Sequence, residues 1–338
     1  MKVFVTGHKG YIGAHLVPLL KEQGHSVTGC DIDYFGGCEW EPLMAPDREI
    51  IGDYGELGEA DLAGHDCVMH LAAISNDPMG DLDPALTYRT NRDSSIALAQ
   101  RAKAAGVGRF LFSGSCSIYG KGAHLDVDEH DELNPVSAYA FSKIETETAV
   151  AKLADASFSP TYLRNATAYG YSPSLRIDLV ANNLLTCALT LGEIRIMSDG
   201  TPWRPLIHCK DIARAFVAFL NAPTGTAHNL ALNVGSNQEN FQVRDVANEI
   251  SRLMPHAKIK YTGEVGADPR NYRVKFDLLG RTLPGFALSY SLRSGLEELY
   301  RKCQEHGFSL ADFQGDRFVR LRTLKKKLQL NQKPAGAR

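Results

Sequence analysis

The sequence has no long hydrophobic run and no excess of positive charge. No apolar stretch approaches the roughly 20 residues that a membrane-spanning helix needs. Met1 leads directly into the alternating pattern KVFVTG, which leaves no room for a secretory leader. Lys and Arg number 37 against 39 Asp and Glu, so the net charge gives no attraction to nucleic acid or to an anionic membrane. We therefore expect small-molecule partners, no nucleic-acid binding and no membrane association.

The sequence also lacks CxxC pairs. Its seven cysteines are scattered, and none has the spacing of a zinc or redox site. An odd number of scattered cysteines is typical of a reducing compartment. We expect a cytoplasmic protein without a metal site.

Short apolar runs alternate with longer helical patterns over the first two thirds of the chain. Strand patterns lie at 2–7, 26–33, 66–73 and 108–115, and helical patterns at 11–24, 84–105 and 137–154. This alternation predicts an α/β fold with a doubly wound parallel sheet of the Rossmann type.

From about residue 166 the loops lengthen around one helix, predicted at 178–192, which indicates a smaller C-terminal substrate-binding domain. We place the Rossmann domain at 1–165, joined by about 203–237. The substrate-binding domain then comprises 166–202 and 238–338. The basic segment 322–338 is expected to be a solvated tail.

A glycine-rich loop joins the first predicted strand to its helix. Gly7, Gly10 and Gly13 have a GxxGxxG spacing, in which the first two glycines let the backbone approach a pyrophosphate and the third allows close helix packing. Asp31 ends the second predicted strand, where a carboxylate accepts hydrogen bonds from the adenosine ribose and repels a 2′-phosphate. The pattern favours NAD over NADP, although His8 and Lys9 offer positive charge that could offset this repulsion.

Tyr139 and Lys143 lie one turn apart in YAFSK, on one face of a predicted helix. A phenol has an ordinary pKa of about 10, so a base at neutral pH needs a neighbouring ammonium that favours the phenolate. By itself the pair is weak evidence, because amphipathic helices often place Tyr and Lys at this spacing.

The order of the motifs carries more information than any one of them. The glycine-rich loop, Asp31, HLAA at 70–73, Asn91, GSCSIYG at 114–120 and YAFSK follow one another along the chain. This series resembles the extended short-chain dehydrogenase/reductase family, with its nucleotide-sugar epimerases and dehydratases. The resemblance implies NAD as cofactor, a nucleotide-diphosphate sugar as substrate, and a homodimer formed through the helices near 84–105 and 137–154.

The resemblance also implies roles for individual residues. Ser115 matches the residue that hydrogen-bonds the reacting hydroxyl, Tyr139 matches the base, and Lys143 matches the residue that tunes Tyr139 and binds the nicotinamide ribose. The implied cofactor contacts are Gly7, Gly10, Tyr11, Ile12, Gly13, Asp31, Asp53, Leu71, Ala72, Ala73, Asn91, Tyr139 and Lys143. The implied substrate contacts are Ser75, Asn165, Asn182, Arg204 and Arg270. The two arginines suit a diphosphate, because a guanidinium fork binds phosphate oxygens in bidentate fashion.

Several reactions are compatible with this set. With bound NAD, Ser115, Tyr139 and Lys143 can convert a sugar hydroxyl into a transient ketone. A 4-epimerase needs only these parts, whereas similar 4,6-dehydratases carry an acid and a base where this chain has Cys116 and Ser117. We therefore favour an isomerase, a nucleotide-sugar epimerase acting at C4 through a 4-keto intermediate.

Cys116 leaves an alternative open. A thiol that faced the substrate could exchange protons and support a dehydratase or a 3,5- or 5-epimerase. The other interpretation is a small residue packed at a strand end. A net 4-keto reductase is a further alternative, and a non-catalytic dinucleotide sensor is disfavoured by the intact catalytic set.

Overall fold

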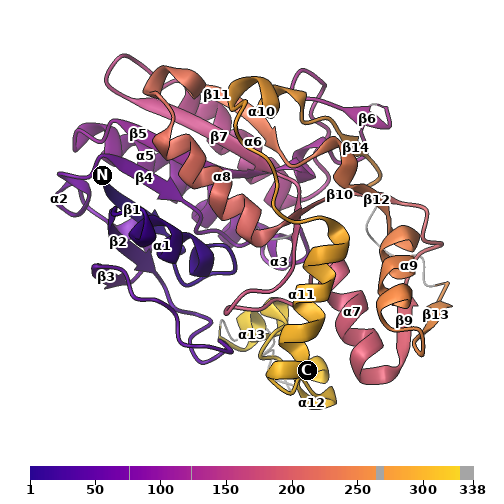
Figure 1. The fold of residues 1–338 in the computed structure, drawn as a ribbon. Coiled ribbons are helices and arrows are strands. Elements are labelled where there is room, and N and C mark those ends of the chain that lie inside the picture. Colours follow the sequence, from indigo (N-terminus) through magenta and orange to yellow (C-terminus); the bar gives the residue numbers. More distant parts are fainter. Residues whose placement is uncertain (76, 123, 264–269, 328–338) are drawn as a thin grey trace, which may run out of the picture.

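The centre of the molecule is a seven-stranded parallel sheet (Figure 1). The computed structural model describes residues 1–75, 77–122, 124–263 and 270–327. The sheet has the order β11-β7-β5-β4-β1-β2-β3, and every neighbouring pair is parallel. Its strands are β1 (Lys2–Thr6), β2 (Ser26–Asp31), β3 (Arg48–Ile51), β4 (Cys67–His70), β5 (Arg109–Ser115), β7 (Ser159–Asn165) and β11 (Leu230–Val234). The predicted Rossmann fold is confirmed.

Helices cover both faces of this sheet, as its apolar strands require. Val3 and Val5 point to the face covered by α1 (Gly13–Glu22) and α8 (Cys209–Asn221), while Phe4 points to the opposite face. That opposite face is covered by α5 (Ser95–Ala104) and α6 (Ala138–Ala151). The small helix α2 (Glu59–Leu62) lies before β4. Because all seven strands are parallel, their carboxyl ends share one edge of the sheet, where the connecting loops meet.

The predicted helix at 84–105 contains an irregular turn. It consists of α4 (Pro84–Thr87), a π-helical stretch at Tyr88–Ser94 and then α5. A π-helix inside an α-helix is rare and often accompanies a functional site. This one carries Asn91, one of the predicted cofactor contacts.

A second, smaller core lies beside the sheet. It is built from α7 (Val180–Leu191), α9 (Val243–Leu253), α11 (Leu292–Glu305) and α12 (Leu310–Gln314). The strands around it are β8 (Thr167–Tyr169), β9 (Glu193–Ile196), β10 (Trp203–His208), β12 (Asn240–Gln242) and β13 (Lys258–Tyr261). The division of the chain into two domains stays a prediction. Segment 272–288, which we assigned to the second domain, packs with the first core. This segment includes β14 (Arg273–Val274), paired with β6 (Asp126–Val127), and α10 (Asp277–Thr282).

The basic C-terminal segment differs from its prediction. Helix α13 (Arg320–Lys327) occupies the start of the expected tail and buries Arg320, Thr323 and Leu324, so the expectation of a solvated tail is wrong for 322–327. Residues 328–338 lie outside the described part of the chain. Across that described part, no helix combines the length and the apolar character needed to span a membrane.

Candidate active site

The carboxyl edge of the sheet borders a cavity of about 1240 Å³. One end is formed by the glycine-rich loop between β1 and α1. Gly7 has a φ of +75°, and a Cβ there would lie 2.8 Å from the Ala72 nitrogen. A Cβ on Gly13 would lie 2.2 Å from the Gly7 oxygen, so only glycine fits these two positions. The loop leaves the N-terminus of α1 open to the cavity, which is the arrangement that binds a dinucleotide pyrophosphate.

Most of the predicted cofactor contacts line this cavity. They are Gly7, Gly10, Tyr11, Ile12, Gly13, Asp31, Asp53, Leu71, Ala72, Ala73, Tyr139 and Lys143. The Asp31 carboxylate is fixed at the end of β2 by the backbone N–H groups of Lys9, at 3.1 Å, and Asp33, at 2.9 Å. The site therefore fits a dinucleotide with a free ribose diol.

The positive charges in the glycine-rich loop are already neutralised. The Lys9 ammonium lies 2.8 Å from the Asp33 carboxylate, and the His8 ring lies 2.8 Å from Glu49. Neither side chain is then available to offset the repulsion between Asp31 and a 2′-phosphate, which leaves the preference for NAD over NADP in place.

The predicted catalytic side chains converge on the same cavity. Ser115 ends β5, and Tyr139 and Lys143 lie on α6. The Lys143 ammonium donates to the Ser113 carbonyl at 2.8 Å, and burial lowers its pKa to about 7. Burial and the Asp77 carboxylate raise the pKa of the Tyr139 phenol to about 12, and hydrogen bonding with Ser115 opposes this rise. A bound positive charge near Tyr139 would lower its pKa toward the working range of a base.

Cys116 does not face the cavity. Its thiol donates to the Arg164 carbonyl at 3.1 Å, its side chain is 1% exposed, and burial raises its pKa. The chain turns into a short 3₁₀-helix at Cys116–Tyr119, which directs this thiol into the core. Ser117 is also buried and does not line the cavity. The alternative in which the Cys116 thiol faces the substrate is therefore wrong, and Ser117, which we also named with the catalytic set, does not reach the cavity either.

Two of the predicted asparagine contacts hold the backbone instead. Asn91 exchanges hydrogen bonds with the backbone of Ile74, at 2.8 and 3.0 Å, and so fixes the loop after β4. Asn182 is fully buried, and its amide donates to the Tyr11 hydroxyl and the Arg176 carbonyl. Neither side chain lines the cavity, so both assignments are corrected. The neighbouring Asn183 lines the cavity in place of Asn182.

The remaining predicted substrate contacts line the same cavity. They are Ser75, Asn165, Arg204 and Arg270. Arg204 is 7% exposed and donates to the backbone carbonyl of Arg270 at 2.7 Å. Arg204 and Arg270 are thus linked through the Arg270 backbone, and both line a cavity that an anionic part of a ligand can enter.

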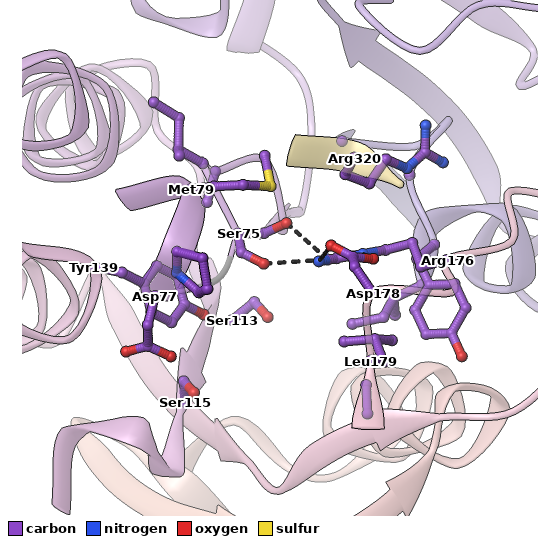
Figure 2. Close-up of a pocket in the computed structure, with 18 of the residues that line it drawn as sticks. Ser75, Asp77, Met79, Ser113, Ser115, Tyr139, Arg176, Asp178, Leu179 and Arg320 are labelled. Carbon is purple, nitrogen blue, oxygen red and sulfur yellow. Dashed lines mark hydrogen bonds and ion pairs between the residues drawn. The ribbon is translucent and has the colours of Figure 1, made fainter. Parts of the chain in front are cut away.

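Asp77, on the short helix α3 (Asp77–Gly80), adds an acid that the sequence did not reveal. Its carboxylate accepts a hydrogen bond from Ser137, the N-cap of α6, and lies 2.5 Å from the Arg270 guanidinium. Figure 2 shows Asp77 on the same side of the cavity as Tyr139 and Ser115. Asp77 therefore connects the catalytic helix to a predicted substrate contact.

Arg176 and Asp178 form the opposite wall in Figure 2. Their side chains make a two-point ion pair, at 2.9 and 3.0 Å. The Arg176 guanidinium also donates to the carbonyl and the hydroxyl of Ser75, at 3.1 and 3.0 Å. A buried cation therefore lies across the cavity from Tyr139.

A family model described as the NAD dependent epimerase/dehydratase family matches residues 3–235. The chain belongs to this family. The suspected relationship to extended short-chain dehydrogenases/reductases is thereby confirmed, and with it NAD as the cofactor.

Relatives of this epimerase/dehydratase chain cover most of its length. A UDP-glucose 4-epimerase of Corynebacterium glutamicum is 28% identical over 271 residues, which are 76% of this chain and 81% of that protein. The solved structure of MoeE5 in complex with UDP-glucuronic acid and NAD is 27% identical with a TM-score of 0.78, covering 90% of this chain and 99% of that chain. The NAD-dependent NDP-hexosamine 5,6-dehydratase TunA has a TM-score of 0.80 at 24% identity, over 90% of this chain and 98% of that chain, and shows the fold alone.

Several cavity residues of this epimerase/dehydratase chain had no readable signal in the sequence. Arg176 and Asp178 lie in a loop whose direction depends on tertiary contacts, and Arg320 lies just before the segment 322–338 that was expected to be a solvated tail. Only Asn183 had a signal, as one of two adjacent asparagines on a predicted helix.

Proposed function

We propose that the protein is an NAD-dependent epimerase that inverts C4 of a nucleotide-diphosphate sugar. The observation that carries this proposal is the convergence of Ser115, Tyr139 and Lys143 on one cavity with the dinucleotide loop. The arginines that line the same cavity suit an anionic substrate. This combination supplies both a proton acceptor and a place for a diphosphate.

The chain's own residues would handle the proton. Ser115 holds the reacting sugar hydroxyl, and Tyr139, polarised by the nearby Lys143 charge, accepts its proton and later returns it. NAD, when bound, supplies the reversible hydride acceptor for the sugar carbon. Since the buried Lys143 has a pKa of about 7, its ammonium form is available near neutral pH to stabilise the phenolate.

The comparisons support the substrate class. The relatives include proteins named UDP-glucose 4-epimerase, and the MoeE5 structures contain UDP-glucose or UDP-glucuronic acid together with NAD. We assign the substrate diphosphate to Arg204 and Arg270, because both guanidinium side chains line the cavity, and we place Asn165 and Asn183 among the further polar contacts of the substrate.

The position of Cys116 favours epimerisation over carbanion chemistry. With this thiol hydrogen-bonded inside the core, the proposed acid/base for a dehydratase or a 3,5- or 5-epimerase is missing. Asp77 lies in the cavity, but its carboxylate is held by Ser137 and Arg270. C4 inversion needs none of these additional groups.

An NMR assay in deuterated water tests the proposal. The protein, supplied with NAD, is incubated with UDP-glucose, UDP-N-acetylglucosamine and UDP-glucuronic acid in turn. We expect one of them to give its C4 epimer with no deuterium on carbon. Deuterium at C3, C5 or C6, or loss of water, would replace this proposal with carbanion chemistry. Stoichiometric conversion of the supplied NAD to NADH would indicate a net oxidoreductase, which in the reverse direction is a 4-keto reductase.

We further propose a cytoplasmic homodimer formed through α5 and α6. The Phe141 ring on α6 is 43% exposed, which a partner helix would cover, and all seven cysteines are free thiols, as in a reducing compartment. Light scattering should give a mass of two chains, and Phe141→Glu should shift it toward one. Cell fractionation should find the protein with cytoplasmic markers.

A further inference from the structure

Helix α13 brings a buried arginine into the cavity wall. Arg320 is 3% exposed and lines the cavity together with Leu324 of the same helix. Its guanidinium lies over the Phe35 ring at 4.1 Å, and its Nη2 donates to the Ser174 carbonyl at 3.2 Å. Its Nη1 is buried and has no hydrogen-bond partner among the described residues. Figure 2 shows Arg320 at the edge of the cavity, near Arg176.

The contacts of Arg320 place it at the cofactor end of the cavity. Ser174, which accepts from Arg320, donates through its hydroxyl to the Lys9 carbonyl at 2.6 Å. Lys9 belongs to the glycine-rich loop. Phe35, which Arg320 covers, follows Asp31 at the end of β2 and also lines the cavity. Arg320 is thus attached to both segments that form the dinucleotide site.

Arg320 forms no direct salt bridge with another described residue, and its Nη1 lacks an acceptor. The neighbouring charged groups are Arg176 and the carboxylates of Asp178 and Glu39. Asp178 is already bound at both oxygens by Arg176. Burial and the Arg176 charge lower the pKa of Arg320 to about 10, so it remains a cation near neutral pH. A buried cation with an unused N–H donor is costly unless a ligand supplies the missing acceptor.

We propose that α13 is part of the cofactor site, with the Arg320 Nη1 donating to the diphosphate of the bound dinucleotide. In this arrangement the glycine-rich loop contacts the diphosphate from one side, and Arg320, at the start of α13, contacts it from another. Leu324 extends the same cover with apolar surface. The inference rests on NAD binding, and it is independent of which sugar is the substrate.

Binding measurements on the full chain, stripped of nucleotide, test this inference. The probes are NAD, ADP, adenosine and UDP, measured by calorimetry with wild type, Arg320→Met and the control Arg322→Met. Arg322 is an exposed residue of the same helix and does not line the cavity. We expect Arg320→Met to weaken NAD and ADP by roughly 10- to 100-fold, the effect of losing one charged hydrogen bond. Adenosine, which has no phosphate, and the Arg322→Met protein should bind as wild type does.

The outcomes separate this inference from the proposed function. If wild type fails to bind NAD, the proposed function fails. If wild type binds NAD and Arg320→Met binds NAD and ADP equally well, only the role of Arg320 is refuted. A loss of affinity confined to UDP would assign Arg320 to the substrate diphosphate and would also refute its contact with the dinucleotide. If Arg320→Met lowers the melting temperature, Arg320→Lys is the second variant to measure. It retains the buried charge without the planar guanidinium, so we expect it to bind ADP severalfold more weakly than wild type does.

Discussion

Removing one hydroxyl from the active site should separate catalysis from folding. Tyr139→Phe keeps the ring in the cavity wall and deletes only the proton acceptor. A positioned base contributes about 10²- to 10⁴-fold to rate, which corresponds to about 2.7–5.4 kcal/mol of transition-state stabilisation. The Tyr139 hydroxyl faces the cavity, so its loss should change the free energy of unfolding by less than about 0.5 kcal/mol.

Tyr119→Phe is the matched control, with the opposite expected result. The Tyr119 side chain is fully buried and does not line the cavity. Its hydroxyl donates to the Asn233 amide oxygen at 2.8 Å and accepts from the Arg164 guanidinium at 3.2 Å. Deleting it leaves both partners short of a hydrogen bond in the core, which should cost about 1–3 kcal/mol of stability. Its kcat should remain that of wild type.

The assay pairs turnover of the substrate identified by NMR with urea unfolding followed by circular dichroism. The account requires that Tyr139→Phe lose activity at unchanged stability and that Tyr119→Phe lose stability at unchanged kcat. Full turnover by Tyr139→Phe would refute its assignment as the base. The reasoning would also be wrong if both variants lost activity and stability in parallel.

Other substitutions test single contacts. Asp77→Asn removes a carboxylate that raises the pKa of Tyr139. The increase of kcat/KM with pH should therefore occur at lower pH than in wild type, and an unchanged pH profile would contradict this role. Asp31→Asn should weaken NAD binding and reduce the preference for NAD over NADP in calorimetry, whereas an unchanged ratio would argue against ribose recognition by Asp31. Asn182→Ala should lower unfolding free energy by about 2–3 kcal/mol, because its buried amide serves three partners. Asn183→Ala should raise KM and leave stability unchanged; the reverse pattern for these two asparagines would restore the sequence-based assignment.

Strands β1, β2, β4 and β5 and helices α1, α5 and α6 were predictable because each has a clear apolar pattern bounded by glycine or a polar turn, whereas β11 and α8 were not among the predicted elements. Strand β3 (Arg48–Ile51) was missed, since it lies at the sheet edge and its residues are mostly exposed. An exposed edge strand needs no apolar pattern, so the sequence gives no sign of it.

The convergence of the predicted catalytic residues on one cavity was predictable for a different reason. Ser115, Tyr139 and Lys143 follow a glycine-rich loop in a recognisable order, and the fold brings these positions to one cavity. The errors concern side-chain direction. Cys116 directly follows Ser115 but turns into the core, because the strand passes into a 3₁₀-helix there.

Adjacent helix positions show the same limit. Asn182 and Asn183 point about 100° apart around α7. The resemblance implied Asn182, whereas Asn183 lines the cavity. Arg320 could not be predicted at all, because its burial depends on contacts with Phe35 and Ser174, far away in the sequence. Local composition carries no record of such contacts.

The most direct test of the account is the fate of the hydrogen at the sugar's C4. A nucleotide sugar deuterated at C4 is converted by the protein with NAD in ordinary water, and the product is analysed by NMR and mass spectrometry. The account predicts inversion at C4 with the deuterium still on that carbon, because the hydride leaves and returns within one closed site. Product that has lost the label to solvent, or that is changed at C5 or C6 and not at C4, would contradict it.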